Sequence, residues 1–71
     1  MEKVEATVAG RILSIEVKVG DTISIEDEVV MIESMKMELP VASEYDGTVT
    51  KICVNVGDEV EEGDVLMELG D

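Results

Sequence analysis

The chain consists of two similar halves, offset by 37 residues. Gly10 to Ile32 aligns with Gly47 to Leu69, and the Gly-Asp pairs 20–21 and 57–58 coincide in this alignment. A 71-residue chain buries only about 60% of the surface that its unfolded form exposes. Neither half is large enough to stand alone, so two copies of one small unit must complete a single core.

Each half has the alternating pattern of short strands. Apolar residues alternate with polar ones in Ile15–Val19 and again in Ile52–Val56, and no segment has a helical period. The core must be aliphatic because Phe and Trp are absent, and β-branched Val and Ile favour strands. The predicted strands are 4–8, 11–18, 22–25 and 28–33 in the first half, and 39–44, 48–55, 59–62 and 65–69 in the second.

We therefore predict an all-β fold in which two four-stranded antiparallel sheets pack as a flattened barrel or sandwich with pseudo-two-fold symmetry. Residues 1–71 form one domain, with repeat halves of about 4–33 and 41–70. Turns are expected at the Gly-Asp pairs, because glycine permits positive φ and aspartate can bond nearby backbone. Glu26 stands where Gly63 stands in the second half, so one turn must form without glycine.

Charge and residue types exclude several classes of function. The net charge of −13 repels nucleic acid and anionic membranes. With no histidine and one cysteine, Cys53, the chain lacks Cys/His metal sites and the usual nucleophilic pairs, so we expect neither an enzyme nor a metal protein. The acidic run from Asp58 to Gly63 is expected to be solvated, because Val60 occupies the third position of a calcium-loop pattern.

No apolar run approaches the roughly 20 residues of a membrane span, and the first residues lack the layout of a secretion signal. We expect a cytoplasmic protein that is monomeric as an isolated domain. Cys53 is expected to be a water-facing thiol in a reducing compartment.

The segment Glu33 to Glu38 allows two interpretations. Met35, Met37 and Leu39 alternate with Lys36 and Glu38, as in an ordinary half-buried strand in which Lys36 faces solvent. An unbroken strand would span about 17 residues, however, well beyond the usual 3–10. We favour a hairpin at 34–37 with Lys36 at its tip. The counterpart of residue 36 falls beyond the C-terminus, so the two-fold places this tip opposite the chain ends.

Residues Glu33 to Met37, Glu-Ser-Met-Lys-Met, resemble the biotin attachment motif of biotinyl domains, usually Glu-Ala-Met-Lys-Met. Gly10, Gly47 and the Gly-Asp pairs also fall where the biotin/lipoyl carrier family, including biotin carboxyl carrier proteins, places them. The resemblance covers nearly the whole chain. It implies the fold called a barrel-sandwich hybrid, a flattened β-barrel of two four-stranded sheets.

The resemblance also implies a function. A biotin protein ligase would attach biotin covalently to Lys36, and the carboxybiotin arm would carry CO2 from a biotin carboxylase to a carboxyltransferase. Met35 and Met37 would be contacts for the ligase, and Glu33 and Ser34 would complete the attachment motif. The chain would be a non-catalytic carrier domain or subunit of a carboxylase.

Two alternatives remain open. Lipoate could occupy Lys36, or one carrier could accept both groups. Lipoyl domains usually have an acidic residue before the lysine and alanine after it, whereas this chain has Met35 and Met37, which favours biotin. The second alternative is an unmodified structural module of the same fold, although such modules typically lack the lysine at the tip.

Overall fold

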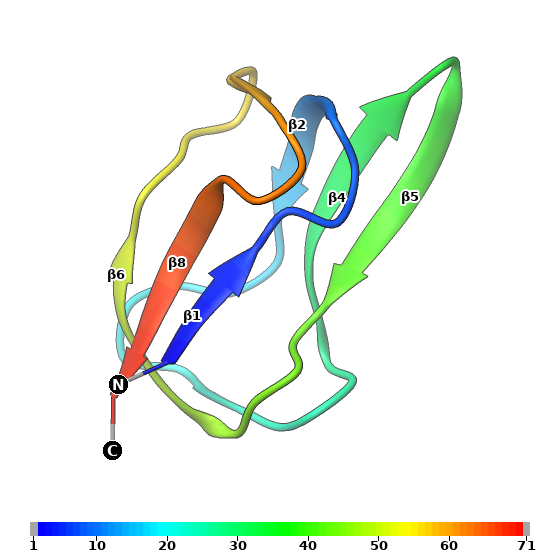
Figure 1. The fold of residues 1–71 in the computed structure, drawn as a ribbon. Coiled ribbons are helices and arrows are strands. Elements are labelled where there is room, and N and C mark those ends of the chain that lie inside the picture. The colour runs from blue at the N-terminus through cyan, green and yellow to red at the C-terminus, as the bar shows by residue number, and fades with distance from the viewer. Residues whose placement is uncertain (1, 71) are drawn as a thin grey trace.

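The computed structural model describes residues 2–70, which form eight strands and no helix. Figure 1 shows them as two layers of antiparallel strands. The strands are β1 (Glu2–Glu5), β2 (Gly10–Ile15), β3 (Thr22–Ile23), β4 (Glu28–Ser34), β5 (Met37–Ala42), β6 (Gly47–Ile52), β7 (Glu59–Val60) and β8 (Val65–Gly70). The predicted all-β fold is confirmed.

The strand order of the two sheets follows the sequence repeat. One sheet has the order β1-β8-β6-β3, and the other has β5-β4-β2-β7. A shift by one repeat turns β1 into β5, β8 into β4, β6 into β2 and β3 into β7, so each order is the image of the other. The expected pseudo-two-fold is therefore present in the topology.

Backbone hydrogen bonds between the halves repeat with the same offset. The Ala6 N–H donates to the Asp64 carbonyl oxygen at 2.8 Å, and the Ser43 N–H donates to that of Asp27 at 2.9 Å. Likewise, the Ile12 N–H donates to the Asp58 carbonyl, and the Val49 N–H donates to that of Asp21, both at 2.8 Å. Each half thus supplies strands and loop carbonyls to the other, as expected of a unit that cannot bury its apolar face alone.

The core shows the repeat in its side chains. Every buried position in one half has a buried counterpart in the other. The pairs are Val4/Val41, Ala6/Ser43, Ile12/Val49, Ile23/Val60, Val29/Leu66, Val30/Met67 and Ile32/Leu69. Ser43 is the one polar member, and its hydroxyl donates to the Tyr45 carbonyl and accepts from the Tyr45 N–H. Its polar group is therefore satisfied within the core.

Four tight turns share one construction. In each, the N–H of the fourth residue, an aspartate, donates to the carbonyl of the first, and the aspartate carboxylate accepts from the N–H of the first. The turns are 18–21, 24–27, 55–58 and 61–64. Their third residue has positive φ, as in type II turns, and is Gly20, Glu26, Gly57 or Gly63. The expected turn without glycine is therefore present, with Glu26 at φ 74°.

Two long strands end earlier than the alternation predicts. Strand β2 stops at Ile15 instead of residue 18, and β6 stops at Ile52 instead of 55. After each of them the chain crosses to the opposite sheet, because β3 and β7 do not belong to the sheets of β2 and β6. Val17 and Val54 still pack against the core, whereas Val19 and Val56 lie exposed in the turns.

The barrel is elongated, with extents of 35 × 19 × 18 Å. The start of β1 and the end of β8 lie together at one end, and the β4–β5 turn lies at the other (Figure 1). Within residues 2–70 there is no helix that is long and apolar enough to cross a bilayer.

Candidate functional site

The β4–β5 hairpin closes with a two-residue turn at Met35-Lys36. The two strands pair from Glu28 opposite Ala42 to Ser34 opposite Met37. Met35 and Lys36 have φ of 53° and 65°, and a type I′ hairpin turn requires positive φ at both of its central residues. Sequences such as Asn-Gly normally occupy these positions. The predicted hairpin is confirmed, and the alternative of one unbroken strand is wrong.

Left-handed backbone is costly at both residues. It places Cβ too close to the following carbonyl oxygen, at roughly 1–2 kcal/mol per non-glycine residue. The antiparallel pairing of β4 with β5 and the buried side chains of Val29, Val30, Ile32 and Val41 offset this cost. Backbone strain that persists at an exposed turn is typical of a functional position.

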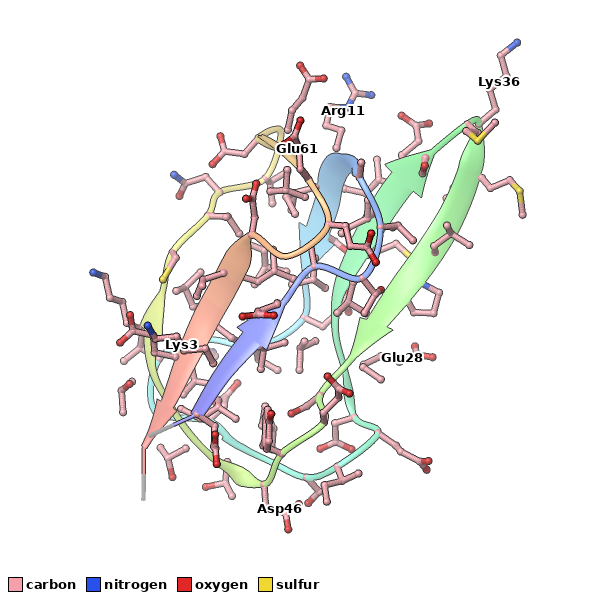
Figure 2. All side chains as sticks on the ribbon, in the orientation of Figure 1. Lys3, Arg11, Glu28, Lys36, Asp46 and Glu61 are labelled. Atoms are coloured by element: carbon pink, nitrogen blue, oxygen red, sulfur yellow. The ribbon has the colours of Figure 1, made fainter. Side chains whose placement is uncertain are left out.

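The turn directs the Lys36 side chain away from the barrel. Figure 2 shows it extending beyond the end of the hairpin, with its nitrogen at the far tip. No carboxylate of residues 2–70 lies within ion-pair distance of Nζ, although 18 acidic residues are present in the chain. The amine is thus accessible to a reagent held by another protein.

The flanking residues of the motif fall into two environments. Met35 is 92% exposed and Met37 is 59% exposed, so both thioethers face water beside the lysine. Ser34 is half-buried at the end of β4. The Glu33 carboxylate pairs with Arg11, with 3.0 Å between Oε1 and Nη2. The structure therefore brings Met35, Lys36 and Met37 together at the tip, whereas the carboxylate of Glu33 pairs with Arg11 on β2.

Arg11 is a residue of this region that sequence reasoning missed. It lies at the start of β2, and its pairing with Glu33 depends on the register between β2 and β4. The repeat gives no indication of this pairing, because the counterparts of Arg11 and Glu33 are Thr48 and Gly70.

An open groove of about 1080 Å³ runs beside the hairpin. Arg11, Glu33 and Met35 line one part of it, and Glu59 and Glu61 line another. Figure 2 shows Arg11 at the same end of the molecule as Lys36, with Glu61 on the neighbouring loop. The groove borders the base of the hairpin, and its charged lining residues are Arg11 and four carboxylates, those of Glu33, Glu59, Glu61 and Asp64.

Two aspartates in and beside the acidic run from Asp58 to Gly63 accept hydrogen bonds in turns. Asp58 accepts a hydrogen bond from the Asn55 N–H at 2.9 Å, and Asp64, just beyond the run, accepts one from the Glu61 N–H at 2.8 Å. Within the described part of the chain, no three His, Cys, Asp or Glu side chains are grouped to hold a metal ion. Cys53 is exposed, as predicted.

The comparisons with known proteins agree with this geometry. A family model described as "Biotin-requiring enzyme" matches residues 2–69. The chain belongs to the biotin/lipoyl attachment family. It is 44% identical over 66 residues to the "Biotin/lipoyl attachment protein" of Bacillus subtilis, covering 93% of this chain and 90% of that protein.

Two further proteins that are similar to this chain differ greatly in length. The chain is 42% identical over 65 residues to the "Biotinylated protein TB7.3 homolog" of Mycobacterium leprae, covering 92% of both proteins. In the crystal structure of the Kluyveromyces lactis urea carboxylase, the matching region has a TM-score of 0.88 and 35% identity. That match covers 97% of this chain but 6% of the larger protein. The attachment fold thus occurs both as a small protein and as a small part of a carboxylase.

Proposed function

We propose that this chain is a biotin carrier, with biotin attached to Lys36 through an amide by a biotin protein ligase. The observation that carries the proposal is the Lys36 amine, held at the tip of a left-handed hairpin turn at the end of the barrel opposite the start of β1 and the end of β8. Methionine on both sides of the lysine and the biotinylated relative support biotin as the cargo.

The local structure fits covalent attachment. Nζ has no ion-pair partner among residues 2–70, so amide formation disrupts no salt bridge of the described fold. Formation of the amide requires the ammonium group of Lys36 to lose two protons, one before and one after Nζ bonds to an activated acyl carbon, from which the activating group leaves. Because no carboxylate of residues 2–70 lies within ion-pair distance of Nζ, we expect the ligase to supply the proton acceptor.

Once attached, biotin would supply a carrier for a carboxyl group between a biotin carboxylase and a carboxyltransferase. The contribution of this chain is to hold the attachment point on a rigid hairpin and to raise the effective concentration of the tethered group at both partner sites. The carrier performs neither reaction. We place it in the cytoplasm, a reducing compartment that suits the exposed free thiol of Cys53.

Lipoate is the second candidate cargo, because the name of the Bacillus subtilis relative includes both groups. The same amine and the same hairpin would serve either acyl group. In that case the partners would be a lipoate ligase and a lipoate-dependent complex.

Intact mass separates these cases. We expect the purified protein to gain the mass of one biotinyl group after co-expression with a biotin protein ligase and biotin, and to bind avidin. Co-expression with a lipoate ligase is the matched experiment, since lipoate adds a different mass. A protein that stays unmodified in both would contradict the carrier function and favour the structural module.

A further inference from the structure

The base of the attachment hairpin carries the one ion pair found among residues 2–70, between Arg11 and Glu33. Arg11 is directly opposite Glu33 on β4 and directly opposite Glu59 on β7, and Glu33 is in turn opposite Glu38 on β5. Residues that are opposite in an antiparallel sheet lie on the same face. A row of three carboxylates and one guanidinium therefore crosses all four strands just below the turn.

Arg11 compensates a repulsion inside the hairpin. Glu33 and Glu38 form the second cross-strand pair below the tip, and like charges that face each other across a strand pair are unfavourable. The Arg11 guanidinium, 3.0 Å from the Glu33 carboxylate, neutralises one member of this pair. Without it, the last strand pairs before Met35-Lys36 would carry uncompensated negative charge.

The backbone is held at the same residue. A Cβ added to Gly10 would lie 2.2 Å from the Glu33 carbonyl oxygen, so the backbones of β2 and β4 approach closely there. Arg11–Glu33 is also the last pair between these strands, and beyond it β4 contacts only β5. At Glu33 the backbone lies against β2 and the side chain pairs with Arg11. The part of the hairpin beyond Glu33 is not paired with β2.

The other end of the barrel supplies a natural comparison. The counterparts of Arg11 and Glu33 are Thr48 and Gly70, which are also paired across strands but carry no charge. The ion pair therefore departs from the two-fold symmetry, and it does so at the end that presents the lysine.

We propose that Arg11 is a positioning residue for modification of Lys36, acting through Glu33 to hold the hairpin in the orientation that the ligase binds. The proposal rests on the function proposed above. An exposed ion pair adds little to global stability, and Arg11 and Glu33 side chains are 57% and 41% exposed. Its loss should leave the barrel folded and broaden the orientations of the hairpin.

The test combines ligase kinetics with backbone amide hydrogen exchange on the free protein. In Arg11→Ala, we expect the KM of the biotin protein ligase for the carrier to rise by a factor of about two to five, the range that one exposed ion pair can supply. The kcat should not change, because the affinity falls in proportion to the fraction of hairpins in the competent orientation. Amide exchange at residues 33–38 should be faster than in the wild type.

Two variants serve as controls. Arg11→Lys keeps a cation within reach of Glu33 and should restore most of the wild-type KM and exchange rates. Lys51→Ala removes the same charge from β6 in the other sheet and should leave both unchanged.

An unchanged KM and exchange rate in Arg11→Ala would overturn the proposal. A raised KM in Arg11→Ala with an unchanged exchange rate would also overturn the proposal, because it would mean that Arg11 contacts the ligase directly. An equal defect in Lys51→Ala would indicate a long-range charge effect instead. If the wild type is not modified by the ligase, the carrier function fails, and the exchange measurement alone still decides whether Arg11 orders the hairpin.

Discussion

The Ser24–Asp27 turn and the Ser34–Met37 turn are the two places in residues 2–70 where residues other than glycine have clearly left-handed φ. Glu26, in the first, has φ 74°, and its counterpart in the other half is Gly63 with φ 94°. Met35 and Lys36, in the second, have no counterpart in the repeat, because the equivalent positions lie beyond the C-terminus.

The difference between the turns lies in what the strained residues present. The Glu26 turn connects β3 to β4, and in the other half a turn with glycine at this position, Gly63, connects β7 to β8. The hairpin turn presents Lys36, and glycine at that position would remove the amine. Two left-handed residues cost about 2–4 kcal/mol together, against a typical domain stability of 5–15 kcal/mol. We therefore expect glycine to relieve the strain at Glu26 without loss of function, whereas glycine at Lys36 would also remove the proposed attachment site.

Lys36→Arg should have the largest effect on function. We expect complete loss of attachment, because a guanidinium stays protonated and is not acylated by the ligase. The free energy of unfolding should change by less than about 0.5 kcal/mol, since the side chain is exposed. Avidin blotting and urea unfolding measure the two effects. Attachment that survives would mean that another lysine is the site.

Gly63→Glu should have the largest effect on stability. The substitution gives the turn at 61–64 the residue that the first half has at Glu26. Glutamate with left-handed φ should lower the free energy of unfolding by about 1–2 kcal/mol. In a domain of this size, that corresponds to a fall in Tm of at least about 4 °C. Open space surrounds the added Cβ, so no clash adds to the cost. An unchanged Tm would show that these turns tolerate glutamate without strain.

Glu26→Gly is the reverse change and should stabilise the protein by about 0.5–1 kcal/mol. The gain is smaller than the loss in Gly63→Glu because glycine also increases the entropy of the unfolded chain. Urea unfolding measures it, and the ligase should modify the variant at the wild-type rate. A slower rate would show that the Glu26 turn also affects modification of Lys36, which contradicts the difference drawn between the two turns.

Met35→Asn should have the smallest effect on stability, a gain of a few tenths of a kcal/mol. Asparagine adopts left-handed backbone more readily than methionine does, and Met35 is 92% exposed, so little packing is lost. We expect the ligase to modify this variant more slowly, because an apolar contact beside the lysine is removed. Normal modification would show that Met35 is not a ligase contact.

Much of the fold could be predicted from the sequence because the repeat fixes equivalent positions. The offset of 37 residues matched the strands, the turns and the buried side chains of the two halves, and it placed the Lys36 hairpin at the end opposite the start of β1 and the end of β8. The excess length of the fused strand, and not any turn residue, indicated the break at Met35-Lys36. Both residues adopt the left-handed φ that Asn-Gly normally adopts, so the usual local turn signal is missing although the turn is present.

Other features depend on long-range geometry. Strands β2 and β6 end where the chain crosses between sheets, and an alternating apolar pattern continues through Val17 and Val54 without showing the crossing. The Arg11–Glu33 pair depends on the register of β2 with β4, which shifts at an irregularity between Ile12 and Ser14. Neither feature has a local signal in the sequence.

Peptide mapping of the modified protein tests the central claim most directly. Cleavage after glutamate releases residues 34–38, a peptide whose one amine-bearing side chain is that of Lys36. After co-expression with a biotin protein ligase, we predict the added mass on this peptide and on no peptide that contains Lys3, Lys18 or Lys51. An unmodified 34–38 peptide from a protein that carries the added mass elsewhere would contradict the account.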